Sequence, residues 1–118
     1  MAGYAATPDG QLLHDQPIVN GARGAAVENQ STLRDRWRYL DVALTHVEGH
    51  VAGLMREPNA PRQVVLVASR EPCPGELGCR KLLPGMLPAG SELVVYVVRD
   101  GEPQYFDTYT GTGTGAAS

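Results

Sequence analysis

Four residues in the middle of the sequence carry side chains that can do chemistry together: His46, Glu48, Cys73 and Cys79. One histidine and two cysteines can bind Zn²⁺ and leave the fourth position open for water, as in catalytic zinc sites. Bound zinc lowers the pKa of that water towards ~7. Glu48 lies two residues after His46, so its carboxylate can face the water and relay its proton without being a ligand. These residue types predict a zinc-dependent hydrolytic reaction.

Each of these residues also has a structural interpretation. Thr45 and Glu48 have the spacing of a capping box, which would use Glu48 at the start of a helix. Cys73 and Cys79 could form a disulfide if the chain is secreted, and His46 alone could be an ordinary, partly buried histidine. Because the four residues occur together in one sequence, we favour the catalytic interpretation.

His50 suggests a different metal motif, since it lies four residues after His46. In the metalloprotease motif H-E-x-x-H, however, the glutamate directly follows the first histidine. Here the string is H-V-E-G-H, so Glu48 is misplaced for that chemistry. We therefore expect His50 to be an ordinary residue on the helix surface or beside a pocket.

Two predicted helices position these residues. Over residues 45–57 apolar side chains recur at helical spacing, which predicts an amphipathic helix with Thr45 as its N-cap. A second helix is predicted over residues 77–83, and Pro84 should end or kink it. Both cysteines flank the start of this second helix, where the helix dipole favours their thiolate forms. Two helix starts, separated by one strand, can thus bring the three ligands together.

Continuous β-branched runs predict the strands. Residues 63–68 and 91–98 are typical of strands buried on both faces, and residues 103–109 resemble an edge strand. We expect turns and two short strands in residues 1–30, and a flexible tail over the alternating threonines and glycines of residues 110–115. The alternation of helices and strands indicates an α/β fold with a parallel portion in its sheet.

Composition limits the class of protein. The 118 residues suit a single domain over 1–118, of which 1–30 and 110–118 are partly irregular, and 42% hydrophobic residues allow a modest core. The net charge of −3 is not that of a globally basic nucleic-acid binder, although a local basic face can still attract a polyanion. No apolar run approaches the ~18 residues needed to cross a bilayer, so we expect no membrane partner. The first residues have neither a basic nor an apolar signal-peptide region, so we expect no signal peptide among them; a domain of a longer secreted protein would also lack one.

A basic cluster with interleaved aromatic residues lies in a predicted short helix over residues 31–40. Single-strand binders use such side chains to hold phosphates and to stack bases. The alternative is a solvated helix face with the tryptophan in the core, and the sequence leaves both interpretations open. The candidate nucleic-acid contacts are Arg34, Arg36, Trp37 and Arg38.

The chemical residues belong to a longer pattern. His46-Val47-Glu48, followed by Pro72-Cys73 and then Cys79, resembles the cytidine deaminase superfamily signature H-x-E…P-C-x-x-C. The strings THVEGHVAGLMRE, VVLVASREPCPGELGC and LLPGMLPAGSELVVYV resemble the SCP1.201-like deaminases, which occur as C-terminal toxin domains of bacterial polymorphic toxins. The resemblance covers roughly residues 45–98. The cysteine spacing departs from the superfamily pattern, because five residues rather than two separate Cys73 from Cys79, and we expect them to form a longer loop.

The resemblance implies a cytidine-deaminase-like α/β fold, with a mixed β-sheet flanked by helices. It implies one zinc ion held by His46, Cys73 and Cys79, with Glu48 as the catalytic residue. The implied reaction is hydrolytic deamination of cytosine to uracil in DNA. We favour single-stranded DNA because extruding a base from a duplex costs unstacking and unpairing energy.

The resemblance also implies a biological setting. The domain would be secreted or delivered as part of a larger bacterial toxin, act in the target-cell cytoplasm and be countered by a cognate immunity protein. We expect the isolated domain to be soluble and monomeric. Three alternatives stay open: action on double-stranded DNA, deamination of free cytidine or nucleotides, and a non-catalytic zinc module for protein interaction. Such a module needs a fourth ligand, for which His14 and His50 are spare.

Overall fold

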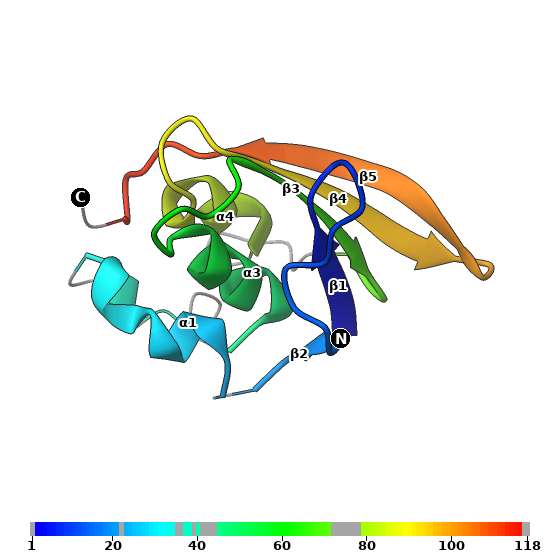
Figure 1. Cartoon of the computed structure of the whole chain (residues 1–118), viewed down its shortest axis with the longest axis horizontal. Coiled ribbons are helices and arrows are strands. Elements are labelled where there is room, and N and C mark those ends of the chain that lie inside the picture. The colour runs from blue at the N-terminus through cyan, green and yellow to red at the C-terminus, as the bar shows by residue number, and fades with distance from the viewer. Residues whose placement is uncertain are drawn as a thin grey trace.

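In the computed structural model the chain forms one mixed β-sheet, and the described helices gather on one face of it (Figure 1). No helix in the described part is long and apolar enough to cross a membrane. The structure describes residues 2–21, 23–34, 37–38, 40, 45–71 and 79–116, with the backbone alone described at 79–81.

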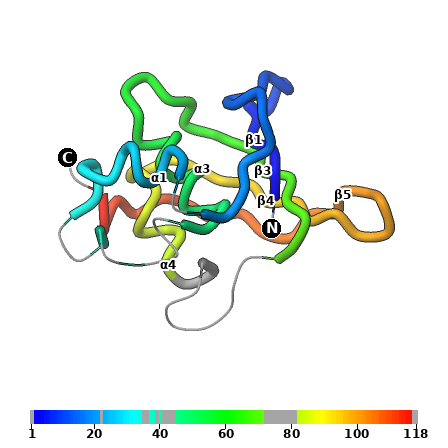
Figure 2. The backbone as a smooth tube through the Cα atoms, turned by 90° about the horizontal axis from the view of Figure 1, so that it is seen from below, coloured from blue at the N-terminus to red at the C-terminus, as the bar shows by residue number. Residues whose placement is uncertain are grey.

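The five strands are β1 (Ala2–Ala6), β2 (Ile18–Val19), β3 (Gln63–Ala68), β4 (Glu92–Arg99) and β5 (Glu102–Thr110). They lie in the order β2-β1-β3-β4-β5. The pair β3 and β4 is parallel and the other pairs are antiparallel, which confirms the predicted parallel portion. β5 lies at an edge, as predicted, and the β4–β5 hairpin extends beyond the other strands (Figure 2).

The described helical elements are α1 (Ala25–Glu28), the 3₁₀ turn η1 (Gln30–Thr32), α3 (Val47–Met55) and α4 (Cys79–Met86). α3 and α4 confirm the two helices predicted around the chemical residues. Pro84 does not end the second helix, however, but lies inside α4. It falls in the last turn of a short helix, where its missing N–H removes a single helical hydrogen bond.

The core lies between the inner face of the sheet and the two helices α3 and α4. Alternate residues of β3 and β4 point inward, and the apolar faces of both helices meet them. These side chains are fully buried, so they fix the helices on the parallel strands. They are Val64, Leu66, Leu93 and Val95 from the sheet, and Val47, Val51, Leu83 and Met86 from the helices.

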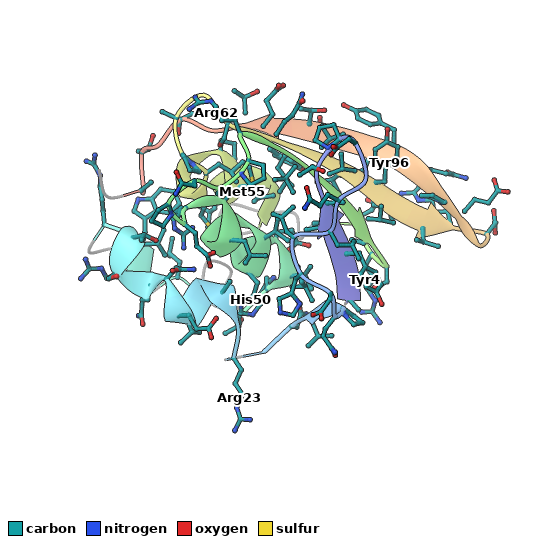
Figure 3. All side chains as sticks on the ribbon, in the orientation of Figure 1. Tyr4, Arg23, His50, Met55, Arg62 and Tyr96 are labelled. Carbon is teal, nitrogen blue, oxygen red and sulfur yellow. The ribbon has the colours of Figure 1, made fainter. Side chains whose placement is uncertain are left out.

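The outer face of the sheet is not covered by any described helix (Figure 1). The strand register aligns four of its side chains, Tyr4, Val67, Tyr96 and Tyr105, in one row across four strands. Tyr4 is 45% exposed and Tyr105 is 59% exposed. The ring centroids of Tyr96 and Tyr105 lie 5.8 Å apart in an edge-to-face arrangement, and Figure 3 labels Tyr4 and Tyr96. The expectation that β3 and β4 are buried on both faces is therefore wrong, because the described helices pack on the inner face alone.

The glycine- and threonine-rich tail is not flexible as expected, because it is hydrogen-bonded along α4. The backbone N–H groups of Thr112, Gly113 and Gly115 donate to three carbonyl oxygens in and after the last turn of that helix, those of Pro84, Leu87 and Gly85. These carbonyls lack partners within a helix, so the tail satisfies them. Glycine permits the close approach: a Cβ atom added at Gly111 would collide with the carbonyl oxygen of Pro88.

Candidate active site

The start of α3 carries the two residues on which the predicted chemistry depends. His46 is the N-cap residue, with an extended backbone (φ −81°, ψ 153°) and a half-buried side chain. Glu48 lies in the first turn and is fully buried. The predicted cap at Thr45 is wrong by one residue, since Thr45 lies in the turn before the helix. Glu48 therefore occupies the second helical position rather than the third position that a capping box requires.

The sheet topology brings the starts of α3 and α4 to the same end of the helix layer. α3 precedes β3 and α4 precedes β4, and these two strands are parallel. Each helix runs opposite to the strand that follows it (Figure 1), so both helix N-termini lie towards the C-terminal ends of β3 and β4. In open α/β sheets this is the end at which ligands bind.

The two cysteines are described only in part. Cys79 is the first residue of α4, so its backbone lies at the same end of the helix layer as His46. Its side chain, and the segment 72–78 that includes Cys73, lie outside the described residues. Within the described residues no group of three His, Cys, Asp or Glu side chains is placed to hold a metal ion. The ligand set His46, Cys73 and Cys79 stays a prediction.

An N-terminal segment for which the sequence predicts only turns and short strands packs against α3. We call residues 20–21 and 23–29 the N-terminal cradle. Asn20 Oδ1 accepts the N–H of Val47 at 3.0 Å, and the N–H of Gly21 donates to the carbonyl oxygen of Thr45 at 2.7 Å. A side chain distant in sequence thus replaces the expected local cap. The Asn-Gly pair indicates a turn, but nothing in the sequence pattern indicates that the turn contacts His46 and Glu48.

His50 lies beside a pocket, the second of its two expected positions, and not on the surface or free to bind a metal. It is 2% exposed, its Nδ1 accepts the N–H of Ala26 at 3.2 Å, and its Nε2 lies 2.9 Å from the carbonyl oxygen of Gly21. Because Nδ1 accepts, Nε2 carries the proton and donates it. Both ring nitrogens are therefore used within the protein. Beside the ring lies a pocket of about 120 Å³, lined mainly by apolar groups such as Ile18 and Leu54.

The sequence of this chain matches one protein family over nearly its whole length. The family model for SCP1.201-like deaminases matches residues 1–113, which is nearly the whole chain. The chain belongs to the SCP1.201-like deaminase family. No curated protein matches it. Membership makes the protein a deaminase, an enzyme that hydrolyses a C–N bond. The motifs that resemble the family lie in residues 45–98. The family match is longer and also includes the N-terminal strands and the cradle.

In this SCP1.201-like deaminase, the described part of the predicted basic cluster has clear packing roles. The indole of Trp37 lies against Gly85 of α4 and Gly115 of the tail, where an added Cβ atom would collide with the ring. The Arg34 Nε donates to the carbonyl oxygen of Ala116 at 3.0 Å, and the Arg38 Nε donates to that of Leu33 at 2.7 Å.

These contacts favour a packing role for the tryptophan. Of the helix predicted over residues 31–40, the described part contains the end of η1 and a short turn at residues 37–38. Arg36 lies outside the described residues, so contact between this cluster and nucleic acid stays a prediction.

A half-buried arginine joins α3 to its neighbours at the opposite end from His46. The Arg56 Nε donates to Thr32 Oγ1 at 2.7 Å, and its Nη1 donates to the carbonyl oxygen of Met86 at 3.1 Å. Burial lowers the pKa of this guanidinium from 12.5 to about 10. Arg56 thereby links α3, η1 and the end of α4. The sequence gives no signal for it, because an arginine at a helix end is ordinarily exposed.

The β4–β5 hairpin is joined by an ion pair to the chain that follows β3. Arg99 at the end of β4 is ion-paired with Glu71, the last described residue before the segment 72–78. A hollow of about 250 Å³ lies beside Arg99 and is lined by Val97, Gln104, Tyr105 and Phe106. The hairpin is thus tied to the chain that leads to Cys73.

Proposed function

We propose that this deaminase converts cytosine to uracil in DNA, with single-stranded DNA as the preferred substrate. The observation that carries the proposal is the burial of Glu48 in the first turn of α3, two residues after His46. A carboxylate fully enclosed by protein has no role in solubility, and its position excludes the capping box. Family membership as a deaminase supplies the reaction class.

The donor set fits zinc, because one imidazole and two thiolates leave a position for water. His46, Cys73 and Cys79 would hold the ion, and the backbone positions of His46 and Cys79 at one end of the helix layer support this assignment. When bound, zinc supplies a water molecule that loses a proton near neutral pH. The described part of the chain supplies the rest of the proposed chemistry.

Glu48 moves the protons. It takes one proton from the attacking water and delivers protons to the ring nitrogen and then to the leaving amine. Water adds at C4 of the base, the C–N bond to the amino group breaks, and uracil and ammonia result. Because Glu48 is enclosed, it serves both steps without exchanging its proton with bulk solvent.

We further propose that the domain is part of a larger bacterial toxin. It would be secreted or delivered into a target cell, act there as a monomer in the cytoplasm, and be countered by a cognate immunity protein. The resemblance to toxin domains supports this setting. Expression in a bacterium tests it: the wild type should raise the rate of C-to-T mutation, and the variant Glu48→Gln should not.

The deciding experiment for the substrate uses matched single- and double-stranded oligonucleotides with one cytosine, read by uracil-dependent strand cleavage. Free cytidine is tested in parallel by the loss of its absorbance. Cleavage of the single strand supports the proposal, and faster cleavage of the duplex replaces it with the double-stranded alternative. Conversion of free cytidine alone makes the protein a nucleoside deaminase. No conversion of any substrate by zinc-loaded protein leaves the non-catalytic zinc module.

A further inference from the structure

The N-terminal cradle contacts α3 at both ends of the helix. At the start, Asn20 accepts the N–H of Val47 and Gly21 donates to Thr45. At the other end, the amide of Asn29 donates to the carbonyl oxygen of Gly53 at 3.2 Å and to Glu57 Oε2 at 2.8 Å. The first set of contacts adjoins His46 and Glu48, and the second lies a full helix length away.

His50 joins the cradle to the first set of contacts. Its ring bridges the carbonyl oxygen of Gly21 and the N–H of Ala26, which are two separate points of the same loop. Gly24 lets the loop lie against the ring, since a Cβ atom added there would be 2.9 Å from Nδ1. The ring is buried and is neutral when both bonds form. Figure 3 shows His50 between α3 and the segment that leads into α1.

We propose that His50 is a positioning residue for the deamination reaction. It holds the Asn20–Gly21 turn in the place from which Asn20 fixes the N–H of Val47. Val47 lies between His46 and Glu48 in the chain, so any movement of its peptide group moves both. This inference rests on the proposed function, since His50 acts on the first turn of α3 and touches no substrate.

The expected effect is on the rate constant rather than on substrate affinity. A misplacement of ~1 Å in a catalytic group can cost on the order of 10²-fold in rate. Loss of the His50 bridge should shift the first turn by less than that, so we expect kcat to fall roughly tenfold while KM changes little. A merely structural role would lower stability and leave kcat of the folded protein unchanged.

Three variants separate these possibilities. His50→Leu removes both hydrogen bonds, whereas His50→Gln keeps one acceptor and one donor on the same terminal group. Asn29→Ala is the matched control, because it also removes two side-chain hydrogen bonds of the cradle, one to Gly53 near the end of α3 and one to Glu57 just after it. Each zinc-loaded variant is assayed on a single-stranded oligonucleotide, at a temperature where circular dichroism shows it folded.

We expect His50→Leu to lose kcat, His50→Gln to recover most of it, and Asn29→Ala to keep it. A second arm uses Asn20→Ala, which removes the acceptor of the Val47 N–H. His50 and Asn20 act through one contact. The double variant His50→Leu/Asn20→Ala should therefore lose no more kcat than whichever single variant has the lower kcat. An unchanged kcat in folded His50→Leu, or an equal loss in Asn29→Ala, would overturn the proposal.

Amide hydrogen exchange measured by NMR on the zinc-free protein tests the same idea without any activity. The amides of Gly21 and Val47 should exchange faster in His50→Leu than in the wild type, and should be unaffected in Asn29→Ala. Unchanged exchange at both amides would refute the positioning role. If the wild type deaminates nothing while these amides respond as expected, the proposed function has failed and the structural link through His50 stands.

Discussion

The two sides of the molecule are held in very different ways. On the α3 side, the cradle reaches the helix through a series of buried or backbone hydrogen bonds and through glycines with no room for a side chain. On the outer face of the sheet, side chains such as Tyr4 and Tyr105 are about half exposed, and no described helix packs on them. Tertiary contacts thus hold α3 at many points, whereas few contacts hold the side chains on the outer face of the sheet.

This difference follows from the need to position α3. α3 is nine residues long, and an isolated helix of that length is not stable in water. Its position must come from tertiary contacts, and the residues proposed to do chemistry are at its start. The outer face carries no proposed chemical residue. Substitutions near α3 should therefore change activity or stability strongly, and substitutions on the outer face should change neither.

The largest effect is expected at Glu48. Glu48→Gln keeps the shape of the side chain but cannot accept the proton, so deamination should fall by roughly 10²–10⁴-fold. Zinc content and the unfolding temperature should stay near those of the wild type, since Glu48 is not a proposed ligand. Oligonucleotide cleavage, metal analysis and thermal unfolding measure the three quantities. A fully active Glu48→Gln would remove the proposed mechanism.

The next effect concerns the metal. Cys79→Ser and Cys73→Ser should each lower zinc content after dialysis, and lower the unfolding temperature, because the free energy of metal binding is also free energy of folding. Asn29→Ala serves as the control, since its hydrogen bonds lie at the far end of α3 from His46 and it should keep its zinc. Full zinc occupancy in both serine variants would exclude the proposed ligand set.

A smaller loss, of stability, is expected at Gly53, where α1 packs against α3. A Cβ atom added at Gly53 would lie 2.7 Å from the carbonyl oxygen of Ala25, and this oxygen belongs to backbone that cannot rotate away. Gly53→Ala should therefore lower the free energy of unfolding by about 1–3 kcal/mol, as other overpacked substitutions do. Chemical denaturation measures this change. A stabilised Gly53→Ala would mean that the two helices can separate at little cost.

The local elements could be predicted from the sequence because their patterns are local. The apolar spacing of residues 45–57 predicts α3, and the β-branched runs predict β3 and β4, with helix and strand alternation indicating their parallel pairing. The open outer face could not be predicted, because β-branched residues suit both a buried and a half-exposed strand. The ordered tail could not be predicted, because glycine allows both flexibility and close packing.

The candidate site shows the same division. His46 and Glu48 are recognised because their chemistry and spacing are local, and the cap at Thr45 is wrong by one residue because helix ends are poorly determined by propensity. The contacts of Asn20 and His50 could not be predicted. They join positions 24 to 29 residues apart, and no period or motif relates such positions.

The smallest effect is expected on the outer face. Tyr4→Ser and Tyr105→Ser each remove a ring that is about half exposed, and exposed substitutions ordinarily change stability by no more than about 0.5 kcal/mol. Tyr105→Ser should lower the free energy of unfolding slightly more than Tyr4→Ser does, because the Tyr105 ring also contacts Tyr96 edge to face. Neither variant should change kcat, since the row lies across the sheet from α3. Denaturant midpoints measure the stability, and oligonucleotide cleavage measures kcat. Leu66→Ala is the control, because Leu66 is fully buried on the inner face of the same sheet. It should lower the free energy of unfolding by about 2–5 kcal/mol. A loss of comparable size in either tyrosine variant would show that the outer face contributes to the fold as much as the core does.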